Sequence, residues 1–414
     1  MSQALRERPP ARRVAPLPLR PPRLCADAPA PFHGWAVVAG AFLVTMVGFG
    51  AVYSYAAFAE EIGATFGSSR TSVSIVYALS GGTCFLVSAL TGPLADRIGA
   101  RVLAVMGMLL VGLGFLVAAA ATSLVEVYIG YGVLIGLGCG FAYVPAIAAV
   151  QRWFNVHRGL ASGIAVSGIG IGTALVPLAA GAFSRVGDWR ATFVACGALT
   201  ALIGVSGALL LAPAPEKHEA APSPRPTPPA SVLSRDFGLA YAGTLLVSLP
   251  SVLPHAMLVS TARDMGLDRH EAMALLGLIG IGTIIGRFLL AALADAVGRR
   301  VVFLLCCGGM TAAMLLWAVA DDKAALQAFA LGFGALQGGF VALLPAFVAD
   351  SFGARSLGGV LGVLYTSRGI ALLAAPPLLA LGIAHLADHA LPILAGALLG
   401  VAGTVLLARV GRGT

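Results

Sequence analysis

The chain has 414 residues, of which 58% are hydrophobic and 11% are charged; its formal net charge is +8 and its mean hydropathy is +0.92. A soluble domain carries about 25% charged residues to cover its surface, so the composition excludes a water-soluble protein and indicates one that resides in a lipid bilayer. Long segments rich in Leu, Val, Ala and Gly exclude a membrane β-barrel, whose strands are short and alternating.

The chain begins with a Pro- and Arg-rich stretch, residues 1–33, that lacks the apolar core of a secretory signal peptide and is predicted to be a disordered cytoplasmic tail. Apolar stretches of about 20 residues then recur, each long enough to cross the ~30 Å hydrocarbon core as a helix. Twelve are expected, at 34–58, 71–94, 101–121, 125–150, 158–183, 190–212, 235–260, 272–294, 301–320, 323–349, 356–381 and 389–410.

The twelve stretches fall into two halves around a second Pro-rich segment. We expect an N-terminal six-helix bundle over 34–212, a cytoplasmic linker at 213–234 and a C-terminal six-helix bundle over 235–410. The predicted fold class is an all-α membrane protein. Lys and Arg are concentrated in the tail, the linker and the loops on the same side, which by the positive-inside rule places both termini in the cytoplasm. This bias accounts for the positive charge without a nucleic-acid partner.

Two turns have closely similar sequences. GPLADRIGARVL (92–103) and AALADAVGRRVV (291–302) share the pattern LAD-x-x-G-x-R-V, and each follows the second helix of its half. The repeat predicts a duplicated six-helix unit. An Asp at a helix end can accept hydrogen bonds from the first N–H groups of a neighbouring helix, and basic residues can pair with it. We therefore expect a latch that gates one end of the protein, formed by Asp96, Arg97, Arg101, Asp295 and Arg299.

These turns resemble the signature loop of the major facilitator superfamily, and the resemblance extends over residues 34–410; the second copy lacks the leading glycine of the signature. The resemblance implies two six-helix bundles that rock around a site near the membrane midplane. The RWF-x-x-x-RGLASGIA block (152–165) and the GR pair (286–287) in the span at 272–294 further resemble bacterial monocarboxylate transporters and the related oxalate/formate antiporters. The span at 125–150 lacks the arginine that drug/proton antiporters of the superfamily usually carry there, which disfavours a drug exporter.

Two arginines lie inside predicted spans, Arg287 in the span at 272–294 and Arg368 in the span at 356–381. A charged side chain at this depth costs roughly 2.5–3.5 kcal/mol on insertion scales, and every acidic residue lies in a tail, a loop or a helix end. Two buried cations without a counter-ion attract an anion, and a guanidinium matches a carboxylate with two hydrogen bonds. Arg287 is predicted to anchor a substrate carboxylate, as the resemblance also implies, with Arg368 as a second binding residue.

Other polar groups in the spans complete the candidate site. The unperturbed pKa of a histidine side chain is about 6.5, which suits a group that carries the coupling proton, and His255 is the candidate for this role. The alternative is that His255 only donates a hydrogen bond. Hydroxyl and amide groups at a suitable depth come from Tyr53, Tyr131, Tyr143, Tyr365 and Gln337.

We expect a secondary transporter of small monocarboxylates such as lactate or pyruvate, in the inner membrane of a bacterium. Its substrate is a small carboxylate anion, and in the symport version a proton on His255 or on the substrate travels with it. The alternatives are an oxalate/formate-type anion exchanger and a carboxylate sensor that does not transport. The sequence contains no nucleophile–base pair, metal-ligand spacing or nucleotide motif, so no enzymatic activity, cofactor or metal is expected.

Overall fold

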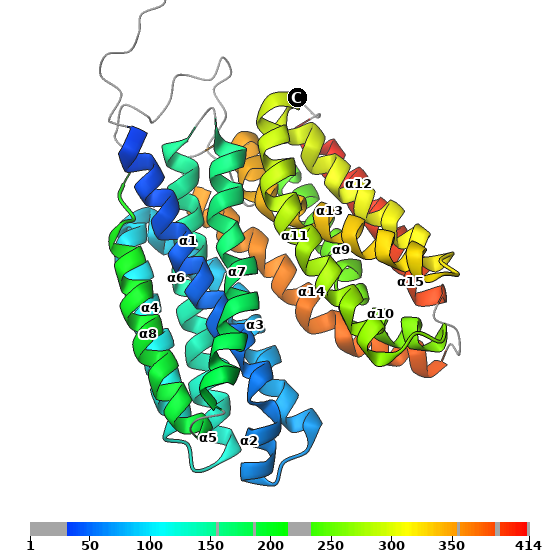
Figure 1. Ribbon diagram of the computed structural model, residues 1–414. Helices are drawn as coiled ribbons and strands as arrows, with labels where there is room; N and C mark the ends of the chain where they lie inside the picture. The colour runs from blue at the N-terminus through cyan, green and yellow to red at the C-terminus, as the bar shows by residue number, and fades with distance from the viewer. Residues whose placement is uncertain are drawn as a thin grey trace, which may run out of the picture.

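The computed structural model describes residues 31–154, 157–184, 188–213, 233–353, 357–385 and 390–411, and throughout this part the secondary structure is helical (Figure 1). The expected tail and linker fall largely on residues 1–30 and 214–232, outside the described residues. The N-terminal bundle contains α1 (Pro31–Ser54), a 3₁₀ turn (Tyr55–Ala57), α2 (Ala59–Phe66), α3 (Arg70–Ile98), α4 (Ala100–Ala119), α5 (Leu124–Val127), a π-helical stretch (Tyr128–Ile135), α6 (Gly136–Trp153), α7 (Arg158–Ser184) and α8 (Trp189–Leu209). The C-terminal bundle contains α9 (Arg235–Ser251), α10 (Leu253–Asp264), α11 (Arg269–Val297), α12 (Arg299–Ala318), α13 (Lys323–Phe352), α14 (Leu357–His385) and α15 (Ala390–Arg409).

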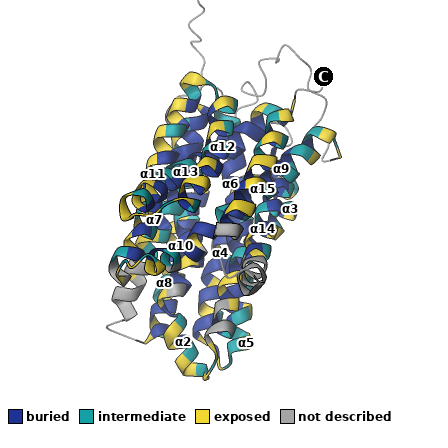
Figure 2. Ribbon diagram, turned by 90° about the vertical axis from the view of Figure 1, so that its right-hand side faces the viewer, coloured by how far each residue is buried: buried dark blue, intermediate teal, exposed yellow. Residues whose placement is uncertain are grey.

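These helices have the length and composition of membrane spans. Within the described residues, eleven helical segments are long and apolar enough to cross a bilayer, and a shorter apolar helix, Ile393–Arg409, follows them. Large apolar side chains cover the outside of the bundles, where Leu90 is 72% exposed and Leu398 is 71% exposed. Figure 2 shows the same division, with buried residues facing inward and exposed residues on the outer faces. The protein therefore presents an apolar surface to lipid, as its composition predicts.

The internal repeat extends well beyond the two similar turns. Helices α3, α4 and α7 begin at Arg70, Ala100 and Arg158, and their counterparts α11, α12 and α14 begin 199 positions later. The turn between the first two helices of each set is a glycine at positive φ, 91° at Gly99 and 122° at Gly298. Glycine adopts this backbone conformation without the penalty of a Cβ. The expectation of two matched six-helix bundles is confirmed.

Two predicted spans are interrupted. The span expected at 34–58 ends at Ser54 and continues through the 3₁₀ turn into α2, and the span expected at 235–260 breaks between α9 and α10. The second break lies between Pro250 and Pro254, and proline provides no N–H for the helical hydrogen-bond ladder. Both interruptions lie in the first span of a bundle. They separate the short helices α2 and α10 from the rest of the bundles.

The bundles meet at one end and diverge at the other (Figure 1). We call the end where α1 begins and α15 ends the termini end, and the end that carries α2 and α10 the opposite end. At the termini end α3 packs against α14, and α7 packs against α11. A Cβ on Gly92 would collide with the carbonyl group of Gly358, and one on Gly163 would collide with the carbonyl oxygen of Arg287. Glycine thus permits the two bundles to touch backbone to backbone.

Candidate functional site

Arg287 lies on α11 at the interface with the other bundle. Only 6% of the residue is exposed, and its Nε and Nη1 atoms are buried without a hydrogen-bond partner among the described residues. A Cβ on Gly170 of α7 would lie 2.6 Å from Nη1, so the guanidinium fits against a position that has no side chain. The ion pairs between described residues do not involve Arg287. A buried cation with open donors is a ready partner for an anion.

Arg368 lies on α14 between two aromatic rings. Its guanidinium carbon is 5.8 Å from the ring centre of Phe85 in α3 and 5.6 Å from that of Phe340 in α13. Cation–π contacts of this kind stabilise a guanidinium without neutralising its charge. Phe85 belongs to the N-terminal bundle, whereas Phe340 and Arg368 belong to the C-terminal bundle. Arg368 therefore contacts both halves of the protein.

Two tyrosines meet beside the arginines. The hydroxyl of Tyr143, on α6, donates a hydrogen bond of 3.0 Å to the hydroxyl of Tyr365, on α14, and both side chains are fully buried. Arg287 and Arg368 act electrostatically on Tyr143 and on each other. The structure thus brings Arg287, Arg368 and Tyr365, all expected in the site, into one cluster with Tyr143.

Tyr53 and His255 line a large cavity on the side of the opposite end. This cavity has a volume of about 1250 Å³, and it is bordered by Tyr55, Glu60 and Tyr77 among others. Tyr53 is 38% exposed and packs edge-on against Tyr77 with ring centres 5.4 Å apart. Tyr53 also lies within electrostatic range of Arg287, so the cavity extends toward the arginine cluster.

Tyr131 and Gln337 have different surroundings. The Tyr131 hydroxyl donates to the carbonyl oxygen of Ala51 and lies 3.0 Å from the Ser54 hydroxyl, inside the N-terminal bundle. The Gln337 amide donates to the carbonyl oxygen of Ser251 at 3.4 Å, inside the C-terminal bundle. These hydrogen bonds hold each side chain within its own bundle, whereas Arg287 and Arg368 contact the other one.

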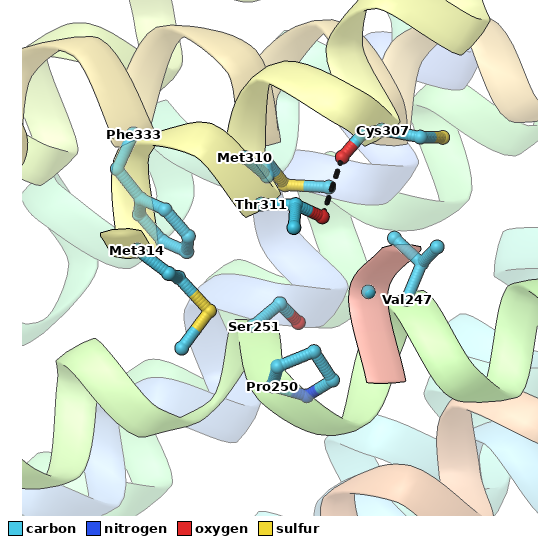
Figure 3. Close-up of a pocket in the computed structure, with 9 residues that line it drawn as sticks. Val247, Pro250, Ser251, Cys307, Met310, Thr311, Met314 and Phe333 are labelled. Atoms are coloured by element: carbon cyan, nitrogen blue, oxygen red, sulfur yellow. Dashed lines mark hydrogen bonds between the residues drawn. The ribbon is translucent and has the colours of Figure 1, made fainter. Parts of the chain in front are cut away.

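A second cavity lies entirely within the C-terminal bundle. Figure 3 shows its wall, which is built largely from apolar side chains such as Val247, Met310, Met314 and Phe333. Its volume is about 10 Å³, roughly the space required by one water molecule. This cavity is too small for a carboxylate, so the candidate site is the arginine cluster and not this cavity. Among the described residues, the side chains form no His, Cys, Asp and Glu cluster that would hold a metal ion.

The carboxylate of Asp96, at the end of α3, reaches the first turn of α14 in the other bundle. It accepts hydrogen bonds from the backbone N–H groups of Gly358 at 3.3 Å and Gly359 at 2.9 Å, and it forms an ion pair with Arg152 of α6. A helix N-terminus offers unpaired N–H groups and the positive end of the helix dipole. One bundle therefore caps a helix of the other.

Asp295 makes the reciprocal contact. At the end of α11, it accepts hydrogen bonds from the N–H groups of Gly159 and Leu160 in α7, both at 2.9 Å. Arg299 lies 3.4 Å from Asp295 and 3.1 Å from Asp350 of α13. We call the two carboxylates at 96 and 295, their ionic partners and the first turns of α7 and α14 the latch.

A further ion pair crosses the latch, since Arg158 of α7 lies 2.6 Å from Asp350. Sequence reasoning missed Arg152, Arg158 and Asp350. The signal for both arginines was present, because they begin the RWF and RG parts of the block at 152–165. Of the residues expected in the latch, Arg97 is exposed, and Arg101 donates instead to the carbonyl oxygen of Leu211 at 2.7 Å within its own bundle.

Fold and site together define a polytopic helical membrane transporter built from two repeated bundles. A family model of the Major Facilitator Superfamily matches residues 38–254 and 240–413, and the chain belongs to this family of transporters, which are not enzymes.

Among curated relatives, Monocarboxylate transporter 12-B of Danio rerio is 27% identical over 381 residues, covering 83% of this chain and 80% of the relative. Monocarboxylate transporter 12 of Mus musculus is 28% identical over 397 residues, covering 85% and 80%. Monocarboxylate transporter 13 of Bos taurus is 28% identical over 359 residues, covering 85% and 83%.

Solved structures share the fold. The proton:xylose symporter XylE bound to 6-bromo-6-deoxy-D-glucose superposes with a TM-score of 0.73 at 14% identity, covering 91% of this chain and 96% of that one. The human organic anion transporter MFSD10 superposes with a TM-score of 0.71 at 18% identity, covering 92% and 100%.

Proposed function

We propose that the protein transports small monocarboxylates such as lactate or pyruvate, and that Arg287 binds the substrate carboxylate. The observation that carries the proposal is the buried guanidinium of Arg287, whose Nε and Nη1 have no hydrogen-bond partner among the described residues. A carboxylate satisfies two such donors at once. The names of the curated relatives support this substrate class.

Transport by this site requires alternating access. The substrate enters through the cavity bordered by Tyr53 and His255 and binds at Arg287, with Arg368 nearby. Partial neutralisation of the two cations then permits the bundles to rock, which opens the latch and closes the cavity. In the symport mechanism, a proton bound at His255 or on the substrate crosses in the same step.

The orientation of the chain follows from its basic residues. We infer that the protein lies in the inner membrane of a bacterium with both termini in the cytoplasm, because Lys and Arg favour the cytoplasmic side. In this orientation the latch closes the cytoplasmic end, and the cavity faces outward.

The proposal is tested by uptake of labelled L-lactate into proteoliposomes, with and without an inward proton gradient. Gradient-driven uptake by the wild type that is lost in Arg287→Ala supports proton-coupled transport with Arg287 as anchor. Arg287→Lys is the informative companion, because lysine keeps the charge but loses the planar fork. Arg300→Gln is the matched control, since that guanidinium donates to the carbonyl oxygen of Ala408 inside the C-terminal bundle. Normal uptake by Arg287→Ala would show that the anchor is wrong.

A carboxylate exchanger is the second candidate, favoured by the presence of a second cation, Arg368, beside Arg287. Uptake that requires preloaded internal substrate and ignores the proton gradient would support exchange. If uptake depends on the gradient, His255→Gln separates the two proton routes. Loss of the gradient dependence assigns the proton to His255, and its retention assigns the proton to the substrate.

High-affinity binding of the carboxylate without flux would support a sensor.

A further inference from the structure

Two hydrogen bonds from side-chain hydroxyls of the N-terminal bundle cross to the C-terminal bundle. Tyr143 of α6 donates to Tyr365 of α14 at 3.0 Å, and Ser162 of α7 donates to the carbonyl oxygen of Ala342 of α13 at 2.6 Å. Tyr143 and Ala342 are 199 positions apart, as are the ends of α6 and α13, whereas Ser162 and Tyr365 are 203 positions apart and differ from the repeat by about one helical turn. All four residues are buried. The N-terminal bundle donates both bonds, and the C-terminal bundle accepts both.

Along α14, the tyrosine pair lies between Arg368 and the latch. An α-helix rises about 1.5 Å per residue, so on α14 Tyr365 is ~9 Å and Arg368 is ~14 Å along the axis from Gly359 in the latch. Tyr143 and Tyr365 are fully buried, whereas Tyr53 on the side of the cavity is exposed. Along α14, the path from Arg368 toward the termini end is therefore blocked by the buried tyrosine side chains before the latch is reached.

Aromatic rings from both bundles surround this pair. Phe49 and Phe85 of the N-terminal bundle lie 5.0 Å and 6.2 Å from the ring of Tyr143, and Phe85 lies 6.0 Å from the ring of Tyr365. Arg368 is placed over Phe85, which is its cation–π contact in the other bundle. A carboxylate offers a guanidinium stronger, charge-assisted hydrogen bonds than an aromatic face does. An anion that draws Arg368 toward itself removes one contact that holds the bundles together at this level.

We propose that Tyr143 and Tyr365 form an inner gate, distinct from the latch, that must separate before a bound anion leaves toward the termini end. Arg368 is a positioning residue of this gate, because its contact with Phe85 is released when it turns to the anion. The proposal rests on the proposed function for the identity of the anion. The gate itself is defined by the contacts between the bundles.

Hydrogen–deuterium exchange of the full-length, substrate-free protein tests the gate. The reporters are the backbone N–H groups that the latch carboxylates hold, at Gly159 and Leu160 and at Gly358 and Gly359. Tyr143→Phe and Tyr365→Phe each keep the ring and remove the crossing hydrogen bond. We expect exchange in both latch peptides to rise about fivefold in either variant, the effect of one lost hydrogen bond on the opening equilibrium. The double variant should rise no further, because both changes remove the same bond.

Tyr131→Phe is the matched control, because this equally buried hydroxyl bonds to Ala51 in its own bundle. It should leave the latch peptides unchanged. Unchanged exchange in Tyr143→Phe and Tyr365→Phe would overturn the gate, and so would an equal rise in Tyr131→Phe, which indicates general loosening. Titration with L-lactate then distinguishes two roles of the tyrosine hydroxyls, as a gate or as ligands of the substrate. Weaker binding without faster exchange would make the hydroxyls substrate ligands. Since the exchange measurement uses no substrate, its failure is distinguishable from a failure of Arg287 as the anchor.

Discussion

Asp295 at the end of α11 accepts a 2.9 Å hydrogen bond from the backbone N–H of Leu160 in the first turn of α7. The contact joins opposite bundles, and it is repeated with the bundles exchanged, where Asp96 accepts a 2.9 Å bond from Gly359. Each carboxylate caps a helix that belongs to the other half. The two caps lie at the same end, so the proposed rocking of the bundles would break both together. Because both caps must break at the same time, we expect the closed termini end to be a discrete state.

The first prediction concerns the charge of these caps. Asp295→Asn keeps one acceptor oxygen but loses the charge that interacts with the helix dipole and with Arg299. We expect the closed arrangement to weaken by about 1–2 kcal/mol. Labelling with a membrane-impermeant maleimide measures the opening, with a cysteine placed at Ser162 in the buried bundle interface. Labelling from the termini side should be roughly tenfold faster when Asp295→Asn is added to Ser162→Cys.

Arg97→Gln is the control for this measurement. Arg97 is an exposed residue of the same signature turn in the first half, and its substitution should leave the labelling rate unchanged. Asp96→Asn should accelerate labelling as Asp295→Asn does. Equal rates in the parent and in both aspartate variants would show that the caps do not hold the termini end closed.

The second prediction separates two glycines on α7. A Cβ on Gly163 meets the backbone of Arg287, which cannot move aside, whereas a Cβ on Gly170 meets the end of the Arg287 side chain at 2.6 Å. Gly163→Ala should force α7 and α11 apart and destabilise the closed interface by about 1–3 kcal/mol. Gly170→Ala should displace the guanidinium and weaken L-lactate binding roughly tenfold, the loss of one charge-assisted hydrogen bond.

Calorimetric titration and thermal unfolding distinguish these two effects. Gly163→Ala should lower the melting temperature, while Gly170→Ala should leave it nearly unchanged and alter the binding constant. Gly280→Ala on α11 is the control, because a Cβ there meets nothing within 4 Å. Wild-type affinity in Gly170→Ala would contradict the placement of the substrate at Arg287.

The fold could be predicted from the sequence because a membrane protein carries two strong sequence signals, its apolar spans and, here, a repeated turn. Apolar runs longer than a bilayer is thick predict spans, and the repeated LAD-x-x-G-x-R-V turn predicts that they form two matched bundles. Arg287 also stood out, since an isolated charge in an apolar run is costly. These inferences depend on local composition and on spacing along the chain.

Contacts between the bundles were harder to predict, because they depend on which helix faces pair. Arg101 and Arg152 both lie near Asp96 in the repeated topology, yet Arg152 forms the ion pair and Arg101 bonds to a backbone carbonyl group. Tyr131 and Tyr143 read alike as polar groups in apolar helices. The structure distinguishes the two tyrosines: the Tyr131 hydroxyl donates a hydrogen bond within its own bundle, and the Tyr143 hydroxyl donates one to the other bundle.

The third prediction is that the anchor lowers stability. Arg287 is buried without an ion-pair partner among the described residues, and the desolvation of a buried ion costs several kcal/mol that no partner offsets. Arg287→Met should therefore raise the melting temperature in detergent while abolishing L-lactate uptake. Arg300→Met is the matched control, because that guanidinium donates to a carbonyl group and its loss should not stabilise. A lower melting temperature for Arg287→Met would indicate that the native state satisfies this charge.

The fourth prediction concerns the two rings that hold Arg368. Of these two rings, Phe85 belongs to the other bundle and Phe340 to the same bundle as Arg368. Phe85→Leu should remove a crossing contact worth about 0.5–1 kcal/mol at a partly exposed site, and so accelerate maleimide labelling of Ser162→Cys by roughly threefold. Phe340→Leu removes the same type of ring at a similar distance, and its contact with Arg368 lies within the C-terminal bundle, so labelling should stay at the parent rate. If both variants accelerate labelling equally, the effect is lost packing, and Arg368 does not connect the two bundles through Phe85.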